Sequence, residues 1–232
     1  MATRQEEKGR EGASVEAMAD AIVGAMPRLD ATEQRIAIAT YRLLAEGEPV
    51  STAAIAMATN QSEGRVEKAL NSWPGVYRDD EGRVVGFWGL TTGRLDPEYR
   101  FLIDGKTSYA WCALDTLFIP ALLGKTVSVE ATDPVTGERV SLVVDQNGVR
   151  DVKPSGAAVS MVIPDGPFGY DVIESFCHKV LFFASEKSGT TWTAQHDGTT
   201  LLSVQEAFEL GRGSKRVYPD ISWPGQAQEE GL

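Results

Sequence analysis

Apolar residues spaced three or four positions apart predict three helices in the first part of the chain. These helices are expected over residues 30–45, 50–58 and 62–70. The first begins at Asp30 with the Asp-x-x-Glu signal of a helix N-terminus. Alternating apolar and polar residues then predict a β-hairpin over 76–90, with its turn at Glu81 and Gly82. Three helices followed by a hairpin is the element order of a winged-helix domain.

The second part of the chain alternates short strands with helices. Strands are expected over residues 99–103, 126–131, 139–145, 149–154, 158–164 and 178–185. Helices are expected after Cys112, after Asp171, near Trp192 and from Ser203, where Ser203 and Glu206 form a capping box. Because turn sequences such as Asp-Pro-Val-Thr-Gly join neighbouring strands, we expect antiparallel pairing. The prediction is an α+β fold in which a winged-helix-like helical domain precedes a domain of antiparallel sheet and helices.

These patterns divide the chain into four segments. We expect a flexible tail and a first helix in residues 1–28, a winged-helix-like scaffold domain in 29–94, a catalytic domain in 95–215 and a C-terminal tail in 216–232. Both ends are polar and charged, which is typical of disordered termini.

Charge argues against nucleic acid as a partner, although a winged helix often binds DNA. The whole chain has a net charge of -11, and residues 1–95 hold 11 basic and 14 acidic side chains. The helix over 62–70 balances two glutamates against Arg65 and Lys68, so it offers no basic face. No apolar run approaches the roughly 18 residues of a membrane span, and the charged N-terminus does not resemble a secretory signal. We therefore expect a cytoplasmic protein with no membrane partner.

Cys112 and Asp115 form the most informative local pattern. If the segment from about Cys112 to Leu123 is helical, residues three apart share one face, so the thiol and the carboxyl point the same way. A cysteine in the first helical turn lies near the positive end of the helix dipole, so we expect a lowered thiol pKa. Like-charge repulsion would then favour a proton shared between the two groups.

The sequence also allows other roles for the cysteines, the histidines and Trp111. A lone cysteine in an apolar run is most often inert core, and the local sequence around Cys177 gives little reason to expect more. A zinc site is disfavoured because the chain has only two histidines, His178 and His196. We expect His178 on the outward face of a strand and His196 in an exposed loop. Trp111 is expected either in the core or as a cover over the site.

Several ordered blocks resemble alkylmercury lyase, the bacterial organomercurial lyase of mercury-resistance operons. The blocks are "YAWCALDTLFIPALLGKTVSVEATDPVTGERVSLVV", "AVSMVIP", "ESFCHKVLFFAS" and "SVQEAFELG". They run from about Thr91 to about Gly211. In some relatives a second cysteine directly follows the Ser-Phe-Cys block, where this chain has His178, and a further cysteine falls near Asp133.

The resemblance implies a site of two cysteines and an aspartate. Carried over by motif, these are Cys112, Asp115 and Cys177. Trp111 is expected to bind substrate on separate grounds, because it lies beside Cys112 and could cover the site. The implied reaction is protonolysis of a carbon-mercury bond: Asp115 shuttles the proton, and Hg(II) is held by Cys112 and Cys177 with Asp115 beside them. The resemblance further implies no cofactor, an organomercurial substrate, cytosolic thiols as partners and mercuric reductase as the acceptor of the product.

Three functions are therefore expected in decreasing order. The first is an organomercurial lyase, which the presence of all three site residues favours. The second is a mercury-binding protein of the same fold that has lost turnover. The third is a winged-helix metal-responsive regulator, which the acidic composition disfavours.

Overall fold

Four helices open the chain in the computed structural model, which describes residues 14–223. They are α1 (Val15–Ala25), α2 (Ala31–Leu44), α3 (Thr52–Thr59) and α4 (Glu63–Ser72). Each begins after a serine or aspartate whose side chain accepts a backbone N–H of the first turn, which satisfies a donor that the helix itself cannot. The predicted capping box of Asp30 and Glu33 is present at the start of α2. The pattern therefore located these helices correctly.

A short hairpin follows the helices. It is built from β1 (Val76–Arg78) and β2 (Val84–Phe87), and a further two-residue turn leads to β3 (Leu90–Thr91). Gly82 lies in the first turn with a φ of 76°, a left-handed conformation that glycine adopts without strain. The order of helices and hairpin confirms the winged-helix-like reading.

The second part of the chain contains the remaining strands and helices. They are β4 (Tyr99–Ile103), β5 (Lys106–Ala110), α5 (Ala113–Leu123), β6 (Val127–Thr132), β7 (Arg139–Asp145), β8 (Gly148–Lys153), β9 (Ala158–Val162), α6 (Val172–Ser175), a 3₁₀ turn η1 (Cys177–Lys179), β10 (Phe182–Phe183), α7 (Glu186–Thr193), β11 (Thr199–Ser203), α8 (Val204–Arg212) and a second 3₁₀ turn η2 (Gly213–Val217). Ser203 and Glu206 form the predicted capping box of α8.

Eight strands form one antiparallel sheet that crosses the expected domain boundary. Their order is β1-β2-β3-β5-β4-β6-β7-β8, and β3 pairs with β5 through Leu90 and Ala110. A smaller antiparallel sheet has the order β10-β9-β11. The fold is therefore α+β as predicted, and the first segment shares its hydrogen-bonded sheet with the second.

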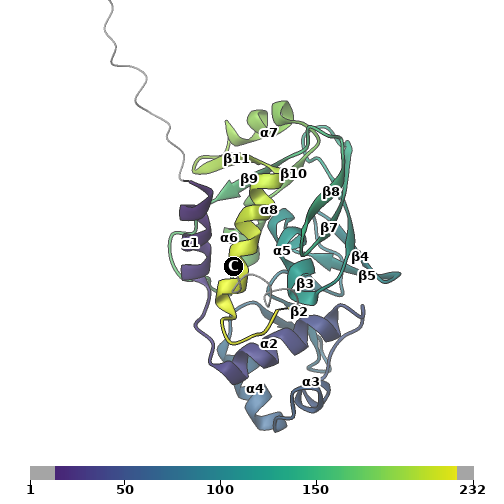
Figure 1. Ribbon diagram of the computed structural model, residues 1–232, viewed down its shortest axis with the longest axis vertical. Helices are drawn as coiled ribbons and strands as arrows, with labels where there is room; N and C mark the ends of the chain where they lie inside the picture. Colours follow the sequence, from purple (N-terminus) through teal and green to yellow (C-terminus); the bar gives the residue numbers. More distant parts are fainter. Residues whose placement is uncertain (1–13, 224–232) are drawn as a thin grey trace, which may run out of the picture.

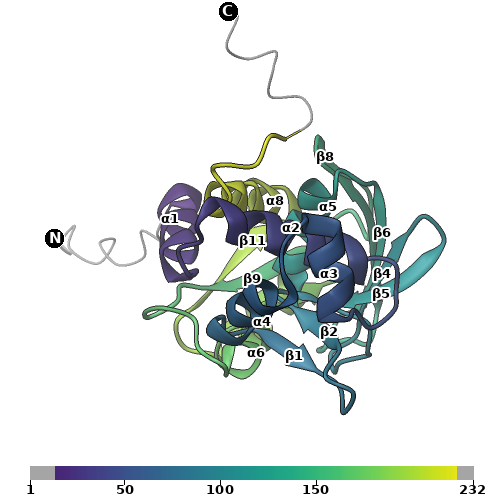
Figure 2. The ribbon, with the colours of Figure 1, turned by 90° about the horizontal axis from the view of Figure 1, so that it is seen from below.

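Helices α5 and α8 lie in the middle of the molecule. Helix α5 contacts β4, β5 and β7 of the large sheet, and α8 packs along α5 and α1. Figure 1 shows α2, α3 and α4 together at one end, with the larger sheet at one side and α7 and the small sheet at the other end. Figure 2 shows α1 beside α8 from a second direction. The buried apolar side chains form one core cluster with members from both sheets and from these helices except α7, whose partly buried Trp192 packs against it.

The expected tails are only partly described by the structure. Tyr218 and Trp223 belong to the expected tail 216–232 and are buried, whereas residues 1–13 and 224–232 lie outside the described residues. The boundaries of the four expected segments stay predictions. Within residues 14–223, no helix is long and apolar enough to cross a membrane.

Two parts of the predicted strand pattern were wrong. The expected strand 178–185 is a 3₁₀ turn at Cys177–Lys179 followed by the two-residue strand β10. The sequence reading also missed β5 and β11. The strand β5 pairs with β4 across a turn at Asp104 and Gly105, both with positive φ, so the Asp-Gly signal of a two-residue hairpin was present but unused.

Candidate active site

The start of α5 carries two of the expected site residues. Cys112 is the N-cap residue, with the extended backbone values φ −151° and ψ 175°, and Asp115 lies in the first turn. The backbone N–H of Ala113 donates to the carbonyl of Val180, which ties this helix start to the segment after Cys177. The helical spacing therefore brings the thiol and the carboxyl to one side, as expected.

Cys177 reaches the same place from a tight turn and not from a strand. The carbonyl of Cys177 accepts the N–H of Val180 at 3.0 Å, which closes the 3₁₀ turn. Cys177 is buried and the adjacent His178 is exposed. His178 is therefore exposed as predicted. The prediction was based on a strand, however, and these residues form a 3₁₀ turn instead.

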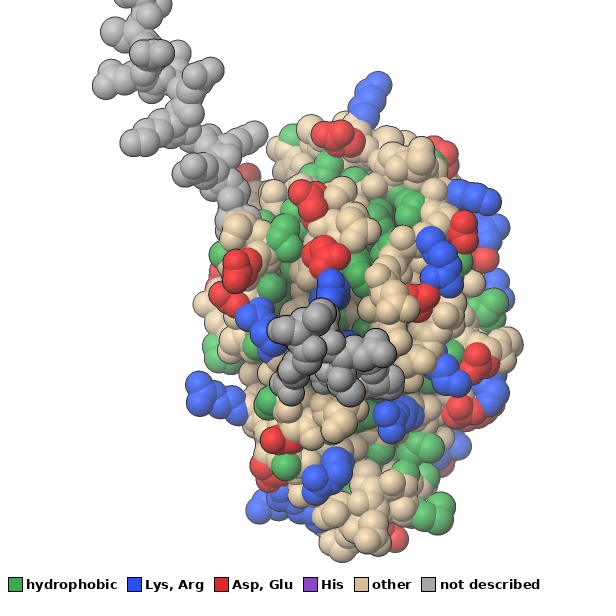
Figure 3. Space-filling model, viewed as in Figure 1, with side chains coloured by type: hydrophobic (Ala, Val, Ile, Leu, Met, Phe, Trp, Pro, Cys, Tyr) green, Lys and Arg blue, Asp and Glu red, His purple; other side chains and the backbone are tan. Residues whose placement is uncertain are grey.

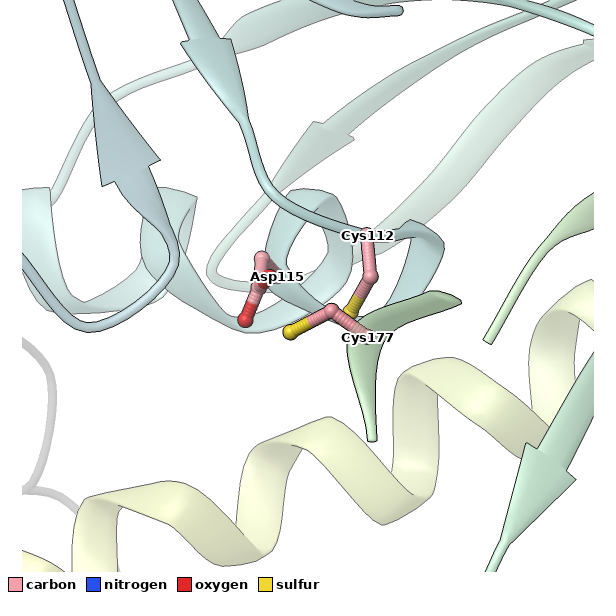
Figure 4. Close-up of side chains that lie close together, drawn as sticks. All are labelled: Cys112, Asp115 and Cys177. Carbon is pink, nitrogen blue, oxygen red and sulfur yellow. The ribbon is translucent and has the colours of Figure 1, made fainter. Parts of the chain in front are cut away.

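The three side chains converge. Figure 4 shows Cys112, Asp115 and Cys177 pointing toward one another from two separate segments. One ligand atom from each residue lies within 4.8 Å of the other two. Their exposed fractions are 0%, 8% and 3%, and both cysteines are free thiols. The distance along the sequence between Cys112 and Cys177 does not predict that they meet. The folded chain brings the three side chains together.

Burial raises the pKa of both thiols. For Cys112, loss of water raises the pKa well above its ordinary value, helped by the neighbouring Cys177 and Asp115. For Cys177, a hydrogen bond with Cys112 lowers the pKa, but burial and Asp115 outweigh it. The expected lowering of the Cys112 pKa was wrong. The residue precedes the first turn, and complete removal from water outweighs the helix dipole.

Asp115 holds a proton for the same reason. Burial raises its pKa to about 7, and hydrogen bonds with the side chain and backbone of Cys112 only partly oppose this. Its Oδ2 is buried without a hydrogen-bond partner. The expected tendency to share a proton is therefore present, but desolvation causes it instead of repulsion from a thiolate. At neutral pH the carboxyl is poised between its two forms.

An apolar cavity of about 50 Å³ leads to these groups. Besides Asp115 and Cys177 its walls are almost entirely apolar and come from α1, the β2–β3 turn, α5, the segment before α6, and η2. The lining residues are Ile22, Val23, Met26, Trp88, Gly89, Trp111, Leu114, Phe118, Phe168, Val172, Phe176, Ser214, Val217 and Tyr218. Such a cavity suits a small apolar ligand group with little accompanying water.

Trp111 is one of these wall residues, beside Cys112. It is 3% exposed, and its ring packs edge-on against Tyr77 at a centroid distance of 5.2 Å. Trp111 is therefore both a buried residue and part of the cavity wall, so the two interpretations that the sequence left open are compatible. The sequence analysis missed the wall residues Trp88, Gly89 and Phe168, because Trp-Gly is not one of the usual turn signals.

Two other residues singled out from the sequence lie apart from this group. His196 is exposed and stacks on Trp192 at 3.6 Å between ring centroids. Asp133 is fully buried and accepts hydrogen bonds from Val135, Thr136, Ala184 and Ser188. These bonds hold the pKa of Asp133 below its ordinary value despite burial, so its role is to fix a turn.

Comparison with protein families identifies the chain. Residues 94–214 match the family model described as alkylmercury lyase, and residues 14–88 match the model of the helix-turn-helix domain of alkylmercury lyase. The chain belongs to the alkylmercury lyase family. An alkylmercury lyase of Staphylococcus epidermidis is 44% identical over 74% of this chain and 77% of its own length. That of Pseudomonas putida is 38% identical over 75% of this chain and 80% of its own.

A solved structure agrees with this family assignment at the level of the fold. A crystal structure described as the mercury-bound form of MerB2 superimposes with a TM-score of 0.68. The match covers 88% of this chain and 98% of that chain, at 19% identity. The α+β architecture and its helix-turn-helix segment are therefore those of the family.

Proposed function

We propose that this enzyme cleaves the carbon-mercury bond of organomercurials by protonolysis and releases a hydrocarbon. One observation carries the proposal: two buried thiols and one buried carboxyl converge within 4.8 Å beside an apolar cavity. Mercury is a very soft metal, so two sulfurs form a natural pair of ligands for it. The carboxyl supplies the proton that the departing carbanion requires.

The proposed reaction balances its protons. Cys112 attacks the mercury of an organomercurial thiolate, R–Hg–SR′, and its thiol proton passes to Asp115. Cys177 then adds as the second sulfur ligand, and its proton leaves with the displaced thiol R′SH. Asp115 delivers its proton to the carbon as the carbon-mercury bond breaks, giving RH. The two thiol protons thus end on RH and R′SH, and Hg(II) remains on Cys112 and Cys177 beside Asp115.

The pKa of about 7 suits Asp115 to both roles. A carboxylate with a usual pKa near 3.8 would be too weak a base to accept a proton from a buried thiol. Raised to near neutrality, the same group can accept a proton in one step and return it in the next. Burial removes water from the carboxyl and so brings the pKa of Asp115 close to neutral pH.

The apolar walls protect the reaction. Trp111 and the other aromatic wall residues would contact the organic group of the substrate and keep water from the mercury. We propose Trp111 as a substrate-binding residue on this basis. Small cytosolic thiols would deliver the substrate and help to remove Hg(II), with mercuric reductase as its final acceptor. The reaction as written needs no further cofactor.

Benzene release from phenylmercuric acetate tests this function. The purified protein with excess small thiol should release benzene over multiple turnovers, measured by gas chromatography. Cys112→Ser and Cys177→Ser should each abolish turnover because a hydroxyl is a poor mercury ligand. Asp115→Asn should keep stoichiometric Hg(II) binding and lose turnover. Turnover retained in Cys177→Ser would contradict the two-sulfur mechanism.

Two further measurements, of mercury binding and of DNA binding, distinguish the two remaining functions. A wild-type protein that binds mercury through its cysteines but releases no benzene would be a mercury-binding protein. DNA affinity that falls with salt would indicate a regulator instead.

A further inference from the structure

The two-residue turn between β2 and β3 has an unusual backbone. Phe87 pairs with Leu90, so Trp88 and Gly89 alone form the turn. Their φ angles are 38° and 97°, both positive, as a tight hairpin of this type requires. Asparagine or glycine usually takes the first position, and a bulky tryptophan there is uncommon. Strained backbone of this kind persists where the surroundings hold it in place.

Three hydrogen bonds hold this turn. The N–H of Trp88 donates to the carbonyl of Gly75 at 3.1 Å, and the N–H of Trp111 donates to the carbonyl of Gly89 at 2.9 Å. The hydroxyl of Tyr41, on α2, donates to the carbonyl of Trp88 at 2.7 Å. Tyr41 is fully buried, so removing its hydroxyl would leave that carbonyl without this donor. The helical segment thus fixes a turn that forms part of the cavity wall.

Gly89 lies directly against the carboxyl of Asp115. A Cβ atom at this position would lie 2.3 Å from Oδ1 and 2.5 Å from Cγ of Asp115. Such distances are far below a van der Waals contact, so only glycine leaves room for the carboxyl where it stands. Because Oδ2 has no hydrogen-bond partner, the close packing of Gly89 against Oδ1 and Cγ helps to fix the location of the carboxyl group.

We propose that Gly89 and Tyr41 are positioning residues that set the location of the Asp115 carboxyl relative to the two sulfurs. Gly89 acts by contact, and Tyr41 acts through the carbonyl of Trp88. The helix-turn-helix segment therefore contributes to the site as well as to the fold. This inference rests on the proposed proton transfer by Asp115 for its effect on turnover, but the contact itself can be tested without turnover.

Gly89→Ala and Gly82→Ala form a matched pair for the test. Gly82 has a similar φ of 76° in the neighbouring turn, and a Cβ there would meet nothing within 4 Å. With phenylmercuric acetate, we expect Gly89→Ala to lower kcat about 10- to 100-fold, with Hg(II) stoichiometry unchanged and KM within about twofold. Gly82→Ala should keep kcat within about twofold. Equal effects of the two substitutions would overturn the proposal.

Melting temperatures test the contact independently of turnover. Gly89→Ala should lower the Tm more than Gly82→Ala does. Adding Asp115→Ala, which removes Cγ and Oδ1 but keeps Cβ at 2.9 Å from the added atom, should recover part of that difference, whereas the same change added to Gly82→Ala should recover none. Additive effects at positions 89 and 115 would contradict the proposed contact. If the wild-type enzyme released no benzene, the proposed function would fail. The non-additive effect of the two substitutions on the Tm would still show whether Gly89 contacts Asp115.

Tyr41→Phe adds no atom, so it tests the turn even where Gly89→Ala gives no folded protein. We expect kcat to fall about 3- to 10-fold with Hg(II) stoichiometry unchanged, because the loosened turn displaces the carboxyl by less. The Tyr41 hydroxyl also hydrogen-bonds Tyr218 of the cavity wall, and Tyr218→Phe, which removes that bond alone, should leave kcat within about twofold. Tyr109→Phe, which removes a hydroxyl bonded to Arg94, is the matched control. Unchanged kcat in Tyr41→Phe, or loss of Hg(II) binding in proportion to kcat, would overturn the assignment of Tyr41.

Discussion

Asp115 combines two properties that rarely occur together in a stable fold: it is almost fully buried, and one of its oxygens has no hydrogen-bond partner. Burying a carboxylate in this way is costly, and the group reduces the cost by holding a proton. The raised pKa is therefore also a statement about stability. The carboxyl proposed to transfer the proton should therefore make the protein less stable as the pH rises from about 4 to about 7.

Asp115→Asn tests this linkage. The folded protein binds the proton up to about pH 7, whereas in the unfolded chain the group releases it near its ordinary pKa of 3.8. Wild-type stability should thus fall between about pH 4 and pH 7, by roughly 4 kcal/mol for this shift. Asparagine does not titrate, so the free energy of unfolding of the variant should increase relative to that of the wild type as the pH rises from 5 to 8. Urea unfolding at both pH values measures the gain. If the free energies of unfolding of variant and wild type differed by the same amount at pH 5 and pH 8, the raised pKa would be contradicted.

At the scale of single residues, the sequence predicted only what helical spacing dictates. Cys112 and Asp115 are three positions apart on a helix, so their common side followed from periodicity. Cys177 joined the site only through the family resemblance, because its position depends on a 3₁₀ turn between α6 and β10. The direction of the Cys112 pKa could not be predicted, since it depends on how completely the folded protein excludes water.

At the scale of elements, the segment before α6 covers the cavity together with α1. Phe168 in this segment packs against Phe176 and Trp88, with ring centroids 5.1 and 6.3 Å away. Its backbone N–H donates to the carbonyl of Ala25 at the end of α1. We therefore infer that this aromatic contact closes the cavity wall beside Cys177.

Phe168→Ala should expose the site. Removal of the ring opens the wall beside Cys177, so we expect both thiols to react with a chromogenic disulfide about tenfold faster than in the wild type. Tyr170→Ala is the matched control, because Tyr170 lies in the same segment and its side chain is 72% exposed. Absorbance of the released thiol gives the rate. Equal rates in the two variants would mean that Phe168 does not cover the thiols.

Helix α4 is the last helix before the hairpin, where a DNA-reading helix would lie, but its charges are balanced and two of them form ion pairs. Arg65 pairs with Asp30 at 2.6 Å, and Arg78 of the adjacent hairpin pairs with Glu67. On the face shown in Figure 3, basic and acidic side chains are interspersed. These arrangements favour the prediction that the protein has no nucleic-acid partner.

Fluorescence anisotropy with labelled duplex DNA checks this prediction. We expect no binding at micromolar protein in about 0.1 M salt, because a net charge of -11 repels phosphate and releases few counterions. Glu63→Lys with Glu67→Lys adds a basic face to α4 and serves as the positive control. Salt-sensitive micromolar binding by the wild type would contradict the prediction.

Element prediction succeeded where apolar periodicity was long and failed where a turn decided the structure. Helix α2 and strand β7 follow clear patterns and were located correctly. The segment after Cys177 has the apolar run of a strand, yet a 3₁₀ turn takes up its first residues. Apolar runs this short do not distinguish a strand from other buried backbone, so tertiary contacts chose between them.

At the scale of the whole molecule, one sheet joins the two segments that match separate family models. The matches cover residues 14–88 and 94–214; β3 lies in the interval between them and pairs with β2 of the first segment and with β5 of the second. Helix α2 also contacts α5, so the core is continuous from one segment to the other. The sequence predicted two domains because their patterns differ, and it could not show that their strands pair.

This continuity predicts that the two segments unfold together. Opening the helix-turn-helix segment alone would break the β3–β5 pairing and expose the buried Tyr41, Trp88 and Trp111 beside the site. Since whole-protein stability is only about 5–15 kcal/mol, such a partly open state would be nearly as costly as complete unfolding. Hydrogen exchange followed by mass spectrometry in increasing urea measures this directly. We expect the slowest amides of α2 and α5 to converge on one free energy and one urea dependence. A lower free energy for α2, with α5 still protected, would instead mean that the segments are separate folding units and that the site tolerates loss of the Tyr41 hydrogen bond.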